Sequence, residues 1–177
     1  MKKLLTFLLI SFLSTQIVDQ EKNINAFISY GAFNITSEES TPYLETYITF
    51  DCNSLVYVKE SSGQYEASIN LTIIFKQGEA IKNYDKYTIT SPKVADTTNL
   101  DGFFMDAQRY SLANGEYQME ITIEDANNKT VRPLEVSESI VIDFPENICF
   151  SSIIALEDYT PSTTESVNSK NGYDLVP

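Results

Sequence analysis

Apolar and polar residues alternate with a period of two along most of the chain beyond residue 26. In segment 64–76 the odd positions are apolar and the even positions are polar, with Ile74 as the exception. Segment 116–124 follows the same rule throughout, with Tyr117, Met119, Ile121 and Ile123 on its apolar side. One apolar and one polar face indicate antiparallel strands that pack on a single side.

Turn-forming pairs such as Ser62-Gly63 and Asn114-Gly115 separate these segments and favour hairpins. Segment 102–110 also has apolar residues at helical spacing, but its neighbours favour a strand. In segment 131–143, Glu138 falls on the apolar side, which predicts a bulge, a change of sheet or an exposed edge. We predict strands at 26–36, 43–51, 55–60, 64–76, 80–90, 103–111, 116–124 and 131–143, and a ninth from Ile148 through Leu156.

A short motif narrows the fold class. Leu112, Gly115 and Tyr117 open an alternating strand, and this spacing is similar to the tyrosine corner of immunoglobulin-like domains. A plain Asn-Gly hairpin with a core tyrosine would look the same in sequence. We therefore predict an all-β fold, an immunoglobulin-like antiparallel β-sandwich of about 7–9 strands at residues 25–147.

The N-terminus predicts export. Lys2 and Lys3 precede an apolar run from Leu4 to Leu13, after which the sequence turns polar. Ten apolar residues in a helix span about 15 Å, roughly half the hydrocarbon core of a bilayer. The pattern is typical of a cleaved signal peptide, here residues 1–16, and predicts a periplasmic or secreted protein without membrane insertion.

Composition then excludes several functions. The net charge is −13, which argues against nucleic acid as a partner. The chain has no histidine, so neither a Ser-His-Asp nor a Cys-His catalytic apparatus can be assembled. Glu116, Glu120 and Glu124 share the polar face of one strand, where charges serve solubility. We expect no enzymatic activity and no cofactor.

Cys52 and Cys149 are the two cysteines, and nothing in their surroundings resembles a zinc motif. In an oxidising compartment they could form a disulfide, or they could be unrelated buried thiols. The loop that begins at Asp125 has too few oxygen ligands at calcium spacing. Three further acids share one connection and could converge, but we interpret them as solvated loop residues: Asp96, Asp101 and Asp106. We expect no metal site.

Tyrosine is abundant, with 11 residues. Tyr43 and Tyr47 share one face of a predicted strand with Glu45 and Thr49. If the opposite face packs on the core, these two tyrosines form an exposed contact stripe. Tyrosine is also an ordinary strand residue, and cross-strand aromatic pairs are common stabilisers.

Several segments carry a family resemblance: 42–48 (PYLETYI), 74–78 (IFKQG), 85–87 (DKY), 108–112 (QRYSL) and 169–177 (SKNGYDLVP). They resemble the N-terminal region of bacterial extracytoplasmic proteins that carry a GWxTD domain further along. The GWxTD motif itself is absent from this sequence. The resemblance implies an immunoglobulin-like sandwich followed, at 148–177, by a linker and the start of an incomplete second β domain. It implies no catalytic residue.

These observations predict a non-catalytic structural or protein-interaction module of the bacterial cell envelope. Its partner would be a protein or a glycan of the envelope. The alternative function is a carbohydrate-binding module that uses exposed tyrosines, with Tyr43 and Tyr47 as the first candidates.

Overall fold

The computed structural model describes residues 23–34, 41–145, 148–164 and 169–176, so the predicted signal peptide lies outside the described residues. The described chain is almost entirely β, with one short 3-10 turn at Cys52–Ser54. The strands are β1 (Ala26–Phe33), β2 (Tyr43–Asp51), β3 (Tyr57–Lys59), β4 (Tyr65–Gln77), β5 (Ala80–Thr90), β6 (Phe103–Ser111), β7 (Gly115–Asp125), β8 (Leu134–Ile142), β9 (Asp158–Pro161), β10 (Ser169–Lys170) and β11 (Tyr173–Val176).

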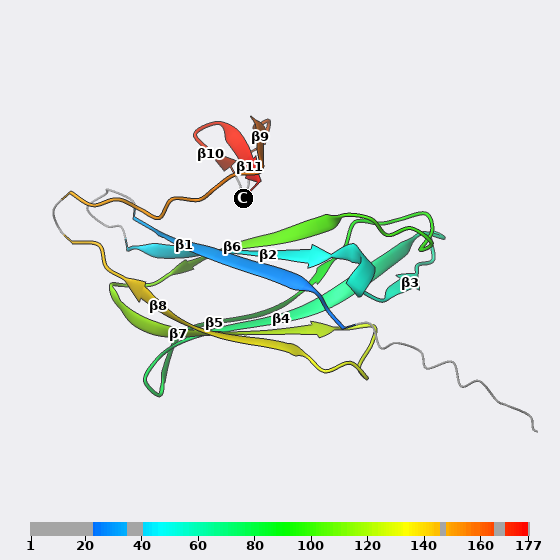
Figure 1. Cartoon of the computed structure of the whole chain (residues 1–177), viewed down its shortest axis with the longest axis horizontal. Coiled ribbons are helices and arrows are strands. Elements are labelled where there is room, and N and C mark those ends of the chain that lie inside the picture. The colour runs from blue at the N-terminus through cyan, green and yellow to red at the C-terminus, as the bar shows by residue number, and fades with distance from the viewer. Residues whose placement is uncertain (1–22, 35–40, 146–147, 165–168, 177) are drawn as a thin grey trace, which may run out of the picture.

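Two antiparallel sheets form the layers of a sandwich (Figure 1). One sheet has the order β1-β2-β6. In the other, β4 pairs with β5 on one side, and on the other side with β3 near its start and with β7 beyond it, and β8 follows β7. Immunoglobulin domains place strands A, B and E in one sheet and C, F and G in the other. Here β1, β2 and β6 take the first set of positions, and β4, β7 and β8 take the second.

The core lies between the two sheets. It consists of the inward-facing residues of β2, β4, β7 and β8, and the alternation in the sequence is the reason these strands have one buried face. In β4, Ile69, Leu71, Ile73 and Phe75 all have 0% exposure. Met119 stands two residues after Tyr117, where an antibody domain carries the second cysteine of its disulfide. Apolar packing occupies that place in this chain.

The prediction of an all-β sandwich is confirmed, and segment 103–111 is a strand, not a helix. Of the alternatives for Glu138, the structure shows the exposed edge: β8 is an edge strand that pairs with β7 without a register shift, and Glu138 is exposed on it. One expectation is wrong. The predicted ninth strand at 148–156 is absent, because this segment forms no ladder with either sheet.

Strands β9, β11 and β10 form a small third sheet of their own, which we call the C-terminal sheet. It lies over the outer face of the β1-β2-β6 sheet, on the side away from β4 and β7 (Figure 1). The extended segment 148–156, which we call the strap, leads to it along β1. Among the described residues, no helix has the length and apolar character needed to cross a membrane.

Candidate functional site

The outer face of β2 carries a buried carboxylate. Glu45 points away from the core, yet only 2% of it is exposed. Arg109, its direct cross-strand partner on β6, donates from Nε to Oε1 at 2.8 Å. Lys170 of β10 donates from Nζ to Oε2 at 2.6 Å, and the Tyr47 hydroxyl also donates to Oε2. The carboxylate is therefore held by three donors, one of them from the C-terminal sheet.

Aromatic rings surround the same carboxylate. The Lys170 ammonium lies 3.8 Å from the centroid of the Phe33 ring. Phe33 in turn stacks on Tyr43, with centroids 5.6 Å apart and planes inclined by 22°. The Arg109 guanidinium lies over the other aromatic ring, 5.9 Å from the centroid of Tyr43. A ring face attracts a cation electrostatically, so carboxylate and rings favour positive groups at this place.

The surroundings shift the pKa values of this cluster. Burial by itself raises the pKa of the Glu45 carboxyl, but the hydrogen bonds from Lys170, Tyr47 and Arg109 outweigh it and hold this pKa below its ordinary value. Burial, the hydrogen bond to Glu45 and its charge raise the pKa of Tyr47. Burial and the charge of Glu45 also raise the pKa of Tyr43. Near neutral pH the site thus holds one carboxylate anion and neutral phenols.

The expected exposed stripe of tyrosines does not exist as predicted. Tyr43 is half-buried, and Tyr47 is only 6% exposed, with its hydroxyl engaged by Glu45. Thr49, which was placed on the same face, is half-buried. Lys170 reaches this face from the C-terminal sheet and contacts both Glu45 and Phe33. The alternation of β2 correctly separates its two faces, but it contains no sign of this cover.

The motif at the start of β7 has the geometry of a tyrosine corner. The Tyr117 hydroxyl donates to the carbonyl of Ala113 at 2.8 Å, back across the turn that precedes the strand. Leu112 is buried at 3% exposure, and Gly115 adopts φ +157° at the first position of β7. This corner connects the two sheets where β6 ends and β7 begins. Its role is structural.

Cys52 and Cys149 are both half-buried free thiols in the structure. Cys52 lies in the 3-10 turn after β2, and Cys149 packs against the core from the start of the strap. No disulfide therefore joins them here. Of the two readings open in the sequence, the structure shows the one with separate thiols.

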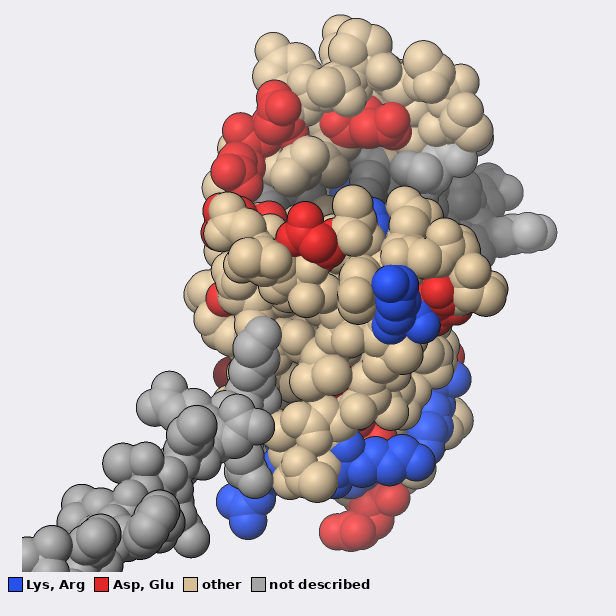
Figure 2. Space-filling model, turned by 90° about the vertical axis from the view of Figure 1, so that its right-hand side faces the viewer, with Lys and Arg blue, Asp and Glu red and all other residues tan. Residues whose placement is uncertain are grey.

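The acidic loops have local structural explanations. Asp125 is 6% exposed, and its carboxylate accepts hydrogen bonds from the backbone N–H groups of Val56, Asn127 and Asn128 at 2.8–3.1 Å. Asp106 accepts the Tyr87 hydroxyl at 2.6 Å, which links β6 to β5. The described residues include no group of three acids or cysteines placed to hold a metal. On the end of the molecule shown in Figure 2, acidic side chains gather mainly toward the C-terminal sheet and basic ones mainly toward the opposite side.

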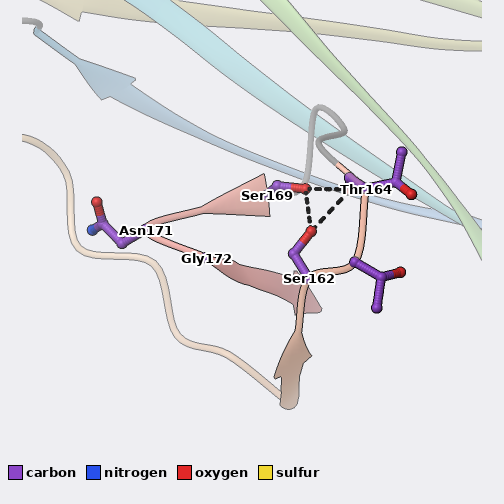
Figure 3. A pocket seen from close by; sticks show the side chains of 6 residues that line it. Ser162, Thr164, Ser169, Asn171 and Gly172 are labelled. Atoms are coloured by element: carbon purple, nitrogen blue, oxygen red, sulfur yellow. Dashed lines mark hydrogen bonds between the residues drawn. The ribbon is translucent and has the colours of Figure 1, made fainter.

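The C-terminal sheet has a hollow of about 260 Å³ lined by hydroxyl groups (Figure 3). Ser162 and Ser169 point toward each other, with their Oγ atoms 3.2 Å apart. The Ser162 hydroxyl also donates to the carbonyl of Thr164 at 2.9 Å. These hydroxyls bond one another and the backbone, so the hollow is a feature of the sheet's own turn.

The strap is the most exposed apolar segment of the described chain. Ile148, Phe150 and Ile153 are 94%, 92% and 97% exposed. The Ser152 N–H donates to the carbonyl of Ala32 at 2.8 Å, the only backbone–backbone hydrogen bond between the described residues 148–156 and β1. The Ala32 and Asn34 N–H groups donate to the hydroxyls of Ser152 and Ser151 at 3.0 and 3.2 Å. Gly31 permits this close approach, because a Cβ there would lie 2.7 Å from Cδ1 of Ile154. The strap therefore presents apolar side chains and unpaired backbone to its surroundings.

No family model, curated protein or solved structure matches this chain. The resemblance to the N-terminal region of GWxTD proteins accordingly stays a prediction. The cluster around Glu45 and the exposed strap were both missed by the sequence reasoning. An acid between two tyrosines on one face of a strand was the available signal for the cluster. The strap was misread because its apolar residues are compatible with a buried strand.

Proposed function

We propose that the protein is a non-catalytic module of the bacterial cell envelope that binds another protein. The observation that supports this most is the strap, where three large apolar side chains are more than nine-tenths exposed. Isolated exposed apolar residues are ordinary, but three within six consecutive positions of one segment favour an interaction surface. Unpaired backbone beside them offers a partner strand hydrogen bonds as well.

A glycan-binding function has less support. Such a module needs exposed rings on which sugars can stack, and Tyr47 is buried with its hydroxyl already bonded. The absence of histidine from the sequence and the lack of a metal-binding group among the described residues favour a non-catalytic role. Export rests on the N-terminal sequence pattern.

Site-specific photocrosslinking tests the proposal. A photoreactive phenylalanine analogue replaces Phe150 of the strap, and a matched control carries it at Tyr84, which is 54% exposed on β5. We expect one envelope protein to crosslink at position 150 and not at position 84. That protein, once purified, should bind the wild-type chain saturably.

The triple variant Ile148→Ser, Phe150→Ser, Ile153→Ser should bind the purified partner at least about tenfold more weakly. The control variant Ile81→Ser, Tyr84→Ser changes exposed apolar residues elsewhere and should bind like the wild type. Equal binding by the strap variant would contradict the proposal. Saturable binding of an envelope glycan that is lost in Tyr43→Ala would favour the alternative.

A further inference from the structure

One of the groups that hold the carboxylate of Glu45 comes from outside its sheet. Arg109 and Tyr47 belong to the same sheet as Glu45 and hold it from the side. Lys170 comes from a segment 125 residues away in sequence. If Lys170 left, Arg109 would still pair with Oε1 and Tyr47 would still donate to Oε2. A position for one more cation would then be open on Oε2.

The open position would have the chemistry of an ammonium site. It has a carboxylate acceptor on one side and the Phe33 ring face on the other. The stack of Phe33 on Tyr43 and the Arg109 contact with Tyr43 hold the rings in place without Lys170. A carboxylate with an aromatic face is the combination that selects a desolvated ammonium group over a neutral one.

The present occupant is held in place by few contacts. Every described residue of β9, β10 and β11 is exposed or half-buried. The segment that contributes Lys170 has two residues, and the Lys170 side chain is itself 27% exposed. Apolar burial supplies most of the free energy that fixes one element onto another. The C-terminal sheet therefore has no fully buried residue among those described, and Lys170 joins it to the sandwich by an ion pair and a ring contact.

We propose that the Phe33, Glu45 and Tyr47 cluster is a recognition site for a lysine side chain of a partner protein, and that Lys170 occupies this site from within the chain. The C-terminal sheet is then a cover that a lysine-bearing partner displaces. A chain with net charge −13 favours a basic partner segment. This inference rests on the proposed function, because it assumes a protein partner, but it uses a different surface from the strap.

The full-length Lys170→Ala variant tests the proposal, because it removes the resident ammonium. The probe is a fluorescently labelled, N-acetylated peptide of residues 169–176, SKNGYDLV, whose lysine is known to fit. We expect saturable binding to Lys170→Ala, with amide NMR shifts at Phe33 and Tyr47. Binding to the wild type should be at least about tenfold weaker, since Lys170 competes.

Two controls isolate the ammonium. The same peptide with an Nε-acetylated lysine should bind Lys170→Ala at least about tenfold more weakly, because the acetyl group removes the charge. Lys59→Ala removes a lysine that lies 5.5 Å from the Tyr65 ring and forms no ion pair with any described residue, and this variant should gain no peptide binding. Equal binding of acetylated and unmodified peptide would overturn the proposal, as would no saturable binding by Lys170→Ala.

Changes in the site itself complete the test. In the Lys170→Ala background, Glu45→Gln should reduce peptide binding at least about tenfold. Phe33→Leu keeps an apolar side chain and should reduce it severalfold, so the test does not depend on one variant that fails to fold. Adding the strap triple variant should leave peptide binding unchanged. The peptide experiment can therefore contradict the proposed lysine site while strap binding is confirmed, and the strap experiment can contradict strap binding while the lysine site is confirmed.

Discussion

The sandwich and the C-terminal sheet are both antiparallel β-structures, but they are held together by different forces. In the sandwich, neighbouring strands bury large apolar side chains such as Phe50, Phe75 and Met119 at 0% exposure. In the C-terminal sheet no described residue is buried, and its ring pair of Tyr159 and Tyr173 is exposed. Lys170 joins it to the sandwich through the carboxylate of Glu45 and the ring of Phe33.

Because of this difference, the sandwich provides the stability of the fold, while the contact at Glu45 is the one that can exchange its cation. Apolar burial is spread over many residues, so no single contact decides whether the two layers stay together. A contact that depends on one charge pair can be replaced by another cation of the same chemistry. The sandwich is therefore the scaffold, and the face around Glu45 is the place where exchange can occur.

The largest expected effect is in the core. Ile73→Ala on β4 should lower the free energy of unfolding by about 2–5 kcal/mol, because it removes a fully buried side chain and leaves a cavity. Leu175→Ala on β11 is the matched change in the C-terminal sheet, where the residue is half-buried, and should cost less than about 1 kcal/mol. Urea denaturation measures both. Equal costs would break the distinction between the two regions.

The next largest loss of stability is expected at Asp125, a buried acid that bonds only groups of the sandwich. Asp125→Ala should cost about 1–3 kcal/mol, because it leaves the backbone N–H groups of Val56 and Asn127 without their acceptor. Asp96→Ala removes an exposed acceptor of one backbone N–H and should change stability by less than about 0.5 kcal/mol. Urea midpoints of the two variants give the comparison. A large loss for Asp96→Ala would argue against burial as the cause.

A smaller effect is expected at the tyrosine corner. Tyr117→Phe keeps the ring but removes the hydroxyl that donates to Ala113, and should cost about 0.5–1.5 kcal/mol. Tyr84→Phe, at an exposed position on β5, controls for the loss of a hydroxyl as such and should be neutral. Thermal denaturation of the two variants side by side is sufficient. If neither variant changes the melting temperature, the hydrogen bond of the tyrosine corner does not stabilise the sandwich.

The sequence predicted the scaffold well because its signals are local. Strands β2, β5 and β6 have the predicted bounds, since alternation and turn residues lie within each segment. The motif at Leu112, Gly115 and Tyr117 likewise spans only six residues. At Glu138 the sequence left a bulge, a change of sheet and an exposed edge open, and the edge is found, because an edge strand tolerates an acid whose side chain reaches water.

The site could not be predicted in the same way. The cation that pairs with Glu45 comes from Lys170, 125 residues along the chain, so no local pattern contains both. The strap shows the opposite error: its apolar residues suggest a buried strand, but it shares a single backbone–backbone hydrogen bond with β1 and forms no ladder with it. Burial is decided by tertiary neighbours, which alternation alone does not specify.

The smallest effect on global stability, and the sharpest test of the comparison, is an acid-induced loosening of the C-terminal sheet. Burial raises the pKa of Glu45, but the hydrogen bonds from Lys170, Tyr47 and Arg109 hold it below its ordinary value of 4.5, and the part that Lys170 contributes is lost when the C-terminal sheet leaves. At neutral pH the ionised Glu45 therefore stabilises the arrangement in which Lys170 is bound to it. This stabilisation is lost progressively as the pH falls below the ordinary pKa of a glutamate. Protonation of Glu45 should therefore weaken the link to Lys170.

Hydrogen exchange at residues 158–164 and 169–176, corrected for the intrinsic effect of pH, should become faster relative to β4 and β7 between pH 6 and pH 3. Glu45→Gln has no charge to lose, so in that variant the C-terminal sheet should exchange fast at both pH values. Acid acts on every carboxylate in the chain, and the difference between the two proteins isolates the contribution of Glu45. If the wild type and Glu45→Gln respond to acid alike, the C-terminal sheet is held by contacts other than this ion pair, and the two regions differ less than their burial suggests.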